Sequence, residues 1–303
     1  MIKTEKLTKK FGAITAVESL DLEIREGEVF GFLGPNGAGK TTTVRMLTSL
    51  IGPSSGTAVV NGFQVGKQDQ NIRRSVGILT ETPGMYDNLS AQRNLEIYAH
   101  LYEVKDIPGT IEHFLRLFGL WERRQDEAGT FSKGMRQKLA IARALLHEPR
   151  IVFLDEPTAG LDPEASRLVR DAILELKKQG RTIFMCTHNL DEADRLCDRI
   201  GVFKTRLVVM DTPERLRSQL FGRKVVFHLK SSDERLAQTV TQLPFVREAR
   251  SLENRLLVTL DNPDEHNPEI VRLLVGAGAD IQFVGELRHS LEEVYLQLVR
   301  NVD

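Results

Sequence analysis

The chain has 303 residues and a formal net charge of −1, with 41% hydrophobic and 27% charged residues. This length suits one large domain or two, and the near-neutral charge gives no electrostatic reason to expect nucleic acid as a partner. No apolar run approaches the roughly 18–20 residues of a membrane span, and charges interrupt the N-terminus before any signal peptide could form. We therefore expect a cytoplasmic globular protein, and any work at a membrane would need a partner that supplies the spanning segments.

A phosphate-binding loop pattern follows the first strands. Partial alternation predicts strands over residues 2–7 and 16–24, and the apolar run Val29–Leu33 suits a buried parallel strand. Gly-x-x-x-x-Gly-Lys-Thr comes next and opens a helix, so its backbone N–H groups can surround an anion. Lys40 would reach the β- and γ-phosphates, and Thr41 would offer its hydroxyl to Mg²⁺. The predicted nucleoside triphosphate site comprises Gly34, Pro35, Asn36, Gly37, Ala38, Gly39, Lys40, Thr41 and Thr42.

Aromatic residues outside this loop have two interpretations each. Phe11 lies beside a glycine between the first two strands, where its ring could stack on a base or belong to the core. A helical segment over about residues 85–145 follows the short predicted strand 76–79 and reads as an insert in an α/β core. Met85, Tyr86 and Trp121 in that insert are either a docking patch for a partner or part of the insert's own core.

Two carboxylates follow a second buried strand. Four apolar residues, Ile151–Leu154, lead directly into Asp155 and Glu156. In open α/β sheets ligands bind at the carboxyl ends of the strands, so Asp155 could hold Mg²⁺ and Glu156 could activate the attacking water. His188 follows the next predicted strand and should emerge at the same edge, either as a structural residue or as a hydrogen-bond partner of the γ-phosphate or the water.

The alternation of strands and helices predicts an α/β fold with a mainly parallel sheet, preceded by N-terminal antiparallel strands. The character of the chain changes near residues 211–223. The segment 222–303 then follows the order β-α-β-β-α-β of a small ferredoxin-like α+β unit, with a second helix starting at Pro268 and one added helix at the end. We expect one domain over residues 1–215, with the helical insert within it, and an accessory domain over 222–303.

Five motifs in order make residues 1–215 similar to the ATP-binding subunit of an ABC transporter. The loop 34–41 resembles Walker A, and the strand 151–155 resembles Walker B. Residues 131–136 occupy the place of the family signature, residues 159–162 resemble the D-loop, and His188 stands where the family has its switch histidine. The resemblance implies a P-loop NTPase core that binds ATP and Mg²⁺.

This resemblance also assigns roles to individual residues. Glu156 and His188 become catalytic residues, and Phe11 takes the place of the adenine-stacking ring, where Tyr is commoner. In the signature, Ser132 and Gly134 are kept, whereas lysine and methionine replace the usual glycine and glutamine at 133 and 135. Glu81 aligns with the Q-loop glutamine, which implies a place at the metal beside Thr41 and Asp155.

The family resemblance further implies a head-to-tail dimer, either of two copies or with a related ATPase subunit. Each ATP would lie between one loop 34–41 and Ser132–Gly134 of the other subunit, and Asp162 of the D-loop segment would also bind the nucleotide. A separate polytopic permease would hold the pair on the inner face of the cell membrane. The ending 287–295 resembles the small domain of drug- and lipid-exporting members, which favours export.

Two other functions are compatible with parts of this pattern. A soluble ABC ATPase of translation or DNA repair is one alternative, but translation members usually resemble two such domains on one chain. Repair members carry long coiled-coil inserts, and the 155 − 40 = 115 positions from Lys40 to Asp155 lack sustained heptads. A regulatory sensor is the other alternative, and residues 222–303 show no recognisable ligand site.

Overall fold

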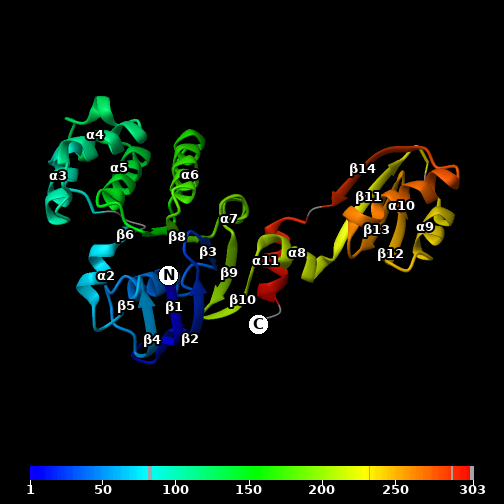
Figure 1. The fold of residues 1–303 in the computed structure, drawn as a ribbon, viewed down its shortest axis with the longest axis horizontal. Coiled ribbons are helices and arrows are strands. Elements are labelled where there is room, and N and C mark those ends of the chain that lie inside the picture. The colour runs from blue at the N-terminus through cyan, green and yellow to red at the C-terminus, as the bar shows by residue number, and fades with distance from the viewer. Residues whose placement is uncertain (81–83, 232, 288, 301–303) are drawn as a thin grey trace. The chain divides into compact units, whose positions relative to one another are not determined.

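The computed structural model describes residues 1–80, 84–231, 233–287 and 289–300. It divides into two compact units, Met1–Asp211 and Thr212–Asp303. Each unit is described by itself below (Figure 1).

A six-stranded sheet forms the centre of the first unit, in the order β10-β9-β3-β8-β7-β6. Five of its strands are parallel, and β10 pairs antiparallel with β9, so the prediction of a mainly parallel sheet is confirmed. The strand β10 was not predicted, because the chain reverses at Thr205, a non-glycine residue with a φ of 62° that carries no turn signature. The strands are β3 (Val29–Leu33), β6 (Val76–Leu79), β7 (Ile151–Asp155), β8 (Thr182–Thr187), β9 (Arg199–Lys204) and β10 (Arg206–Asp211).

A second sheet of the first unit is antiparallel, in the order β2-β1-β4-β5. It confirms the predicted N-terminal antiparallel strands, and its other two strands follow the phosphate loop and its helix. Its members are β1 (Ile2–Phe11), β2 (Ile14–Ile24), β4 (Ser55–Val60) and β5 (Phe63–Gln64).

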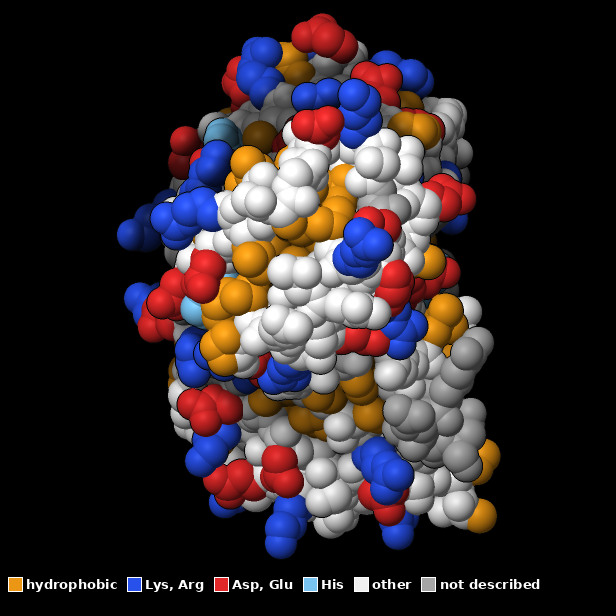
Figure 2. Space-filling model, turned by 90° about the vertical axis from the view of Figure 1, so that its right-hand side faces the viewer, with side chains coloured by type: hydrophobic (Ala, Val, Ile, Leu, Met, Phe, Trp, Pro, Cys, Tyr) orange, Lys and Arg blue, Asp and Glu red, His pale blue; other side chains and the backbone are white. Residues whose placement is uncertain are grey.

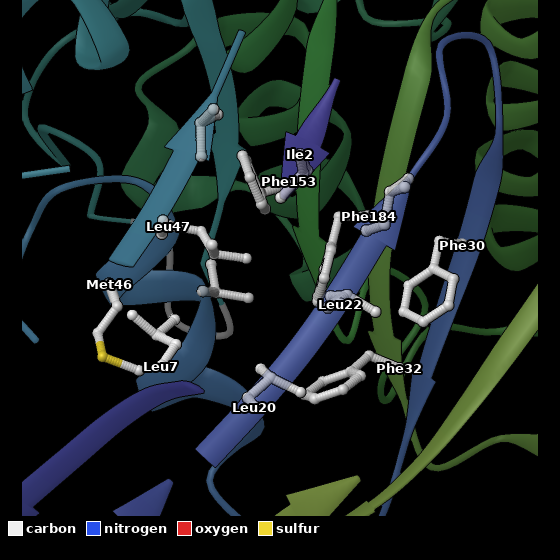
Figure 3. Packing of buried hydrophobic residues seen from close by; sticks show 14 of the residues in the cluster. Ile2, Leu7, Leu20, Leu22, Phe30, Phe32, Met46, Leu47, Phe153 and Phe184 are labelled. Atoms are coloured by element: carbon white, nitrogen blue, oxygen red, sulfur yellow. The ribbon is translucent and has the colours of Figure 1, made fainter. Parts of the chain in front are cut away.

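The hydrophobic core between these sheets anchors the nucleotide-binding segment. Phe30 and Phe32 of β3 pack with Phe184 of β8, at ring-centroid distances of 5.7 and 5.3 Å. Figure 3 shows Leu20 and Leu22 of β2 beside these rings, with Met46 and Leu47 of the helix after the loop on the other side of the same cluster. The strand before the loop and the helix after it are therefore both fixed by burial, which holds the two ends of the loop in place.

Helices cover the sheets, and a group of them forms the predicted insert. α1 (Lys40–Leu47), α2 (Asp69–Ser75), α6 (Pro163–Lys178) and α7 (Leu190–Leu196) belong to the α/β part. In Figure 1 the remaining helices gather to one side of the sheets. They are α3 (Ala91–Leu101), α4 (Ile107–Leu117), the 3₁₀ turns η1 (Trp121–Arg123) and η2 (Ala128–Thr130), and α5 (Lys133–Leu145).

The aromatic residues of the insert occupy two different environments. Trp121 is half-buried, and the guanidinium groups of Arg116 and Arg124 lie 4.7 and 4.4 Å from its ring centroid. Cation–π contacts of this kind hold the ring in place. Tyr86 is 51% exposed, so it is not part of the insert's core.

A half-buried histidine, His147, lies just after the end of α5. The His147 ring stacks on Tyr102 with centroids 3.9 Å apart, and its Nε2 lies 3.2 Å from the carbonyl of Val76. Burial lowers the pKa of His147 from its ordinary value of 6.5 to about 4. The unfolded chain therefore binds a proton at His147 more readily than the folded chain does. The contribution of the neutral, buried ring to the free energy of unfolding is fully present above pH 6.5 and is lost as the pH falls towards 4.

We expect acidification to about pH 5 to remove about 2 kcal/mol of unfolding free energy through His147. The His147→Gln variant, which cannot titrate, should show a shallower loss of thermal midpoint between neutral pH and pH 5 than the original chain. His113→Gln, at an exposed histidine of the same insert, is the matched control and should keep the original slope. An unchanged slope in His147→Gln would show that His147 is not the titrating group.

The second unit contains a four-stranded antiparallel sheet in the order β12-β13-β11-β14. With two helices this is a β-α-β-β-α-β arrangement, so the ferredoxin-like prediction is confirmed. The predicted start of the second helix at Pro268 was wrong. It begins at Pro263, and Pro268 lies inside it, because the earlier proline takes the first-turn position. The elements are β11 (Arg223–Leu229), α9 (Glu234–Thr241), β12 (Val246–Leu252), β13 (Arg255–Leu260), α10 (Pro263–Gly276) and β14 (Ile281–Leu287).

Two further helices flank this sheet in the sequence. α8 (Pro213–Phe221) precedes it, and α11 (Leu291–Arg300) follows it. The rings of Phe221 and His289 stack 4.1 Å apart and join the ends of these two helices. α8 was not predicted, although Thr212 accepts a hydrogen bond from Arg215 N and Pro213 stands at the first helical position.

Neither acidic nor basic side chains dominate the face drawn in Figure 2. On the face drawn in Figure 2, acidic and basic side chains alternate, with hydrophobic side chains between them. Within the described residues, no helix has the length and hydropathy that a membrane crossing requires.

Candidate nucleotide site

The phosphate loop joins β3 to α1. Gly37 and Gly39 have φ angles of 79° and 102°, in the left-handed region that side chains disfavour. Gly39 is the N-cap of α1, and no side chain caps this helix, so its first N–H groups are available to an anion. The Lys40 ammonium lies within the same loop and donates to the carbonyls of Gly34 at 2.7 Å and Pro35 at 3.1 Å.

Close backbone contacts explain why glycine is required in the loop. A Cβ on Gly39 would lie 2.1 Å from the carbonyl oxygen of Ala16, and one on Gly34 would lie 2.2 Å from that of Phe203. Both neighbours are backbone atoms in strands, so neither can move aside cheaply. The Ala16 contact brings β2 to the edge of the site, which the sequence did not indicate.

A hydroxyl and a carboxylate meet at the start of α1. Thr41 Oγ1 donates to Asp155 Oδ2 at 2.8 Å, although the two residues are 114 positions apart in the chain. Asp155 is 3% exposed and stands at the last position of β7. Mg²⁺ prefers oxygen ligands and is commonly held by one or two protein oxygens together with substrate phosphates. This pair therefore fits Mg²⁺, whereas Glu81 lies outside the described residues.

Glu156 and His188 are in direct contact. His188 Nδ1 lies 2.9 Å from Glu156 Oε1, with the carboxylate side chain 11% exposed and the imidazole 61% exposed. Glu156 has a φ of 51°, an uncommon conformation for a residue with a side chain. Its N–H nevertheless donates to the carbonyl of Cys186 at 2.9 Å, which ties the residue to the end of β8.

These groups surround one cavity of about 430 Å³. It collects most of the predicted residues of the loop, both carboxylates and the histidine, and it adds two alanines that the sequence did not single out as site residues. No chemical signal marks Ala16, whereas Ala159 belongs to the segment resembling the D-loop. The lining residues are Ala16, Asn36, Gly37, Ala38, Gly39, Lys40, Thr41, Thr42, Asp155, Glu156, Ala159 and His188.

A second group of predicted residues lies elsewhere in the unit and does not line this cavity. Ser132 Oγ accepts from Met135 N at 3.3 Å and caps α5, and Asp162 Oδ1 accepts from Ala165 N at 2.8 Å and caps α6. A Cβ built on Gly134 would lie 3.9 Å from Asp162 Oδ2, so the starts of these two helices are neighbours. The site residues thus fall into two separate groups.

Phe11 belongs to neither group. It ends β1, is 51% exposed, and lies 5.1 Å from the ammonium of Lys9. An exposed ring beside a cation can receive a base, so stacking on adenine stays a prediction.

Comparison with known proteins identifies the fold and the family. Residues 17–159 match the family model described as "ABC transporter". The bacitracin transport ATP-binding protein BcrA of Bacillus licheniformis is 34% identical over 301 residues, which cover 99% of this chain and 97% of that protein. The daunorubicin resistance ATP-binding protein DrrA3 of Streptomyces coeruleorubidus is 33% identical over 98% of this chain and 95% of its own length. The chain belongs to the ABC transporter ATP-binding proteins.

Solved structures support the same assignment for this ABC ATPase. An ATP-binding subunit of an ABC transporter has a TM-score of 0.68 and 31% identity, and covers 72% of this chain and 92% of its own. The dimeric cassette MJ0796, described in a post-hydrolysis state with ADP and Pi, has a TM-score of 0.65 and 25% identity over 70% of this chain and 98% of its own. The chain is accordingly an ATP-binding ATPase, and subunits of this family dimerise and act with a membrane permease. A role in translation or DNA repair is not favoured.

Proposed function

We propose that this ABC ATPase works as a head-to-tail dimer and powers export through a separate permease. Each of two ATP molecules would lie between the loop 34–42 of one subunit and the Ser132, Gly134 and Asp162 of the other. The observation that carries this proposal is the separation of the site residues into two groups, of which one alone lines the cavity of the loop. A single chain would therefore supply only one part of each ATP site, and a second subunit placed head to tail would supply the other part.

The start of α5 has the charge that such a closing surface needs. Ser132 caps this helix of 13 residues, and the helix dipole favours an anion there. Lys133 adds an ammonium that lies against Gly160, whose φ of 67° and missing side chain leave room for it. A positive surface of this kind would stabilise the γ-phosphate that the other subunit holds.

Several residues that line the cavity would each have a different role in ATP hydrolysis. Glu156 would accept the proton of the attacking water, because its carboxylate stands at the cavity and is held by His188 at 2.9 Å. His188 would orient the water or hydrogen-bond the γ-phosphate. Thr41 and Asp155 would hold Mg²⁺, which when bound would offset the negative charge of the phosphates.

The names of the relatives support a direction of transport. Their names refer to bacitracin transport and to daunorubicin and linearmycin resistance, and they align with 98–99% of this chain, including the second unit. We propose export of an antibiotic or a related compound, with the ATPase held on the cytoplasmic face of the membrane by its permease. The second ATPase subunit would be an identical copy or a related chain, and the second unit would be a separate accessory domain.

Co-purification from membranes tests this proposal. The tagged full-length chain, expressed in its own host and extracted in mild detergent, should carry with it one polytopic membrane protein in a stoichiometric amount. Mock purification from cells without the tag controls for background. Recovery with ribosomes or DNA, and without any membrane protein, would contradict the proposal of a transporter subunit.

A further inference from the structure

A buried carboxylate lies behind the catalytic pair. Glu192 on α7 is 3% exposed, and none of the roles described above uses it. Its Oε2 accepts a hydrogen bond from Thr158 Oγ1 at 2.6 Å, and its Oε1 lies 3.4 Å from Arg170 Nη1 on α6. A buried carboxylate is costly unless it is paired, so these contacts hold the three segments together in the folded chain.

The contact between Thr158 and Glu192 spans the same two segments as the catalytic pair. Thr158 comes two residues after Glu156, and Glu192 comes four residues after His188. The start of α7 is fixed in turn, because Glu192 N donates to Asn189 Oδ1 at 3.2 Å and Asn189 N donates to Thr187 Oγ1 at 2.9 Å. The segment after the general base is therefore tied to the segment after the histidine.

His188 needs support of this kind. Its side chain is 61% exposed, so packing does not fix its position, and the distance to Glu156 depends on where the two backbones lie. The backbone at Glu156 is itself in a left-handed turn, which a surrounding network must maintain. We infer that Glu192 is a positioning residue for ATP hydrolysis, which acts through Thr158 to hold Glu156 and His188 in contact. The inference rests on the proposed roles of Glu156 and His188.

Thr158→Val is the sharpest test, because it removes the hydroxyl and keeps the shape of the side chain. We expect kcat for ATP hydrolysis to fall about 10- to 100-fold, since small displacements of catalytic groups cost rates of this order. The KM for ATP should change by less than about twofold, because the phosphate loop is untouched. Thr158→Ser restores the hydroxyl and should recover most of the lost rate.

A spectroscopic measurement separates positioning from general destabilisation. The ring signal of His188, identified by its loss in His188→Ala, reports the contact with Glu156 in protein labelled at histidine. In Thr158→Val this signal should move towards its position in Glu156→Ala, which removes the carboxylate that His188 contacts. Thr239→Val, at a half-buried threonine of the second unit whose hydroxyl donates to Arg235 O within α9, is the matched control and should change neither the signal nor kcat.

The outcomes are distinct. An unchanged kcat in Thr158→Val, or a lowered kcat with the His188 signal in its original place, would overturn the inference. Glu156→Gln and His188→Ala, measured in parallel, test the proposed roles themselves. If both keep full activity, the proposed roles fail. If both are impaired while Thr158→Val is fully active, only the positioning role of Glu192 fails.

Discussion

Replacing Glu156 with glutamine should lower kcat for ATP hydrolysis by about 10²- to 10⁴-fold, which is the usual contribution of a general base. The amide cannot take the proton of the attacking water, but it has the same shape and can still contact His188. ATP binding should persist, because the loop, Lys40 and Thr41 are unchanged and the backbone of residue 156 is tied to Cys186. The variant should therefore bind ATP and keep it bound without hydrolysing it.

This variant also reports on the dimer. With ATP and Mg²⁺ it should elute from a sizing column as a stable dimer, since hydrolysis no longer opens the pair. Glu175→Gln, at a half-exposed carboxylate of α6 away from the cavity, is the matched control and should hydrolyse ATP at the original rate. A Glu156→Gln chain that stays monomeric at every ATP concentration would count against a composite site.

Replacing Lys40 with alanine should weaken ATP binding by about 100-fold or more, because hydrogen bonds to charged groups contribute about 1.5–3 kcal/mol each. Lys40 is 7% exposed and is the one lysine that lines the cavity of the loop. Its present acceptors are loop carbonyls, which a triphosphate would replace as the stronger partner. Equilibrium titration with a fluorescent ATP analogue measures the loss.

A matched lysine elsewhere controls for the general loss of charge. Lys230→Ala removes an exposed lysine of the second unit and should leave ATP affinity unchanged. Equal affinity of Lys40→Ala and the original chain would show that the loop does not bind the phosphates. Unchanged thermal midpoints in both variants would confirm that the comparison is between folded proteins.

The parts of the site that the sequence predicted depend on local patterns. The run Val29–Leu33 and the glycines after it specify a strand, a loop and a helix within a few residues, and the structure has all three. Asp155 and His188 both line the cavity, because the ends of parallel strands share an edge of the sheet. The contact between Thr41 and Asp155 follows from this geometry.

What the sequence did not predict depends on contacts between distant segments. Ala16 enters the site only because Gly39 needs space beside the backbone of β2, and nothing in its chemistry marks it. Nothing in the sequence singles out Glu192, and its burial appears only when α6 and the turn at Thr158 pack against α7. β10 was missed because a threonine, not a glycine, makes the turn before it.

One mixing experiment tests the composite site most directly. Two differently tagged chains, both carrying Glu156→Gln, are prepared with one further change each. Lys40→Ala disables the loop, and Ser132→Asp keeps a good helix cap while placing a negative charge against the γ-phosphate. Either chain alone should remain monomeric with ATP, since every site it could form lacks one half.

Mixed together with ATP, the two chains should form pairs that carry both tags and hold one ATP each. One site of such a pair joins an intact loop to an intact Ser132, and the other site lacks both. Absence of mixed pairs, or ATP-dependent pairing of either chain by itself, would contradict a site shared between two subunits.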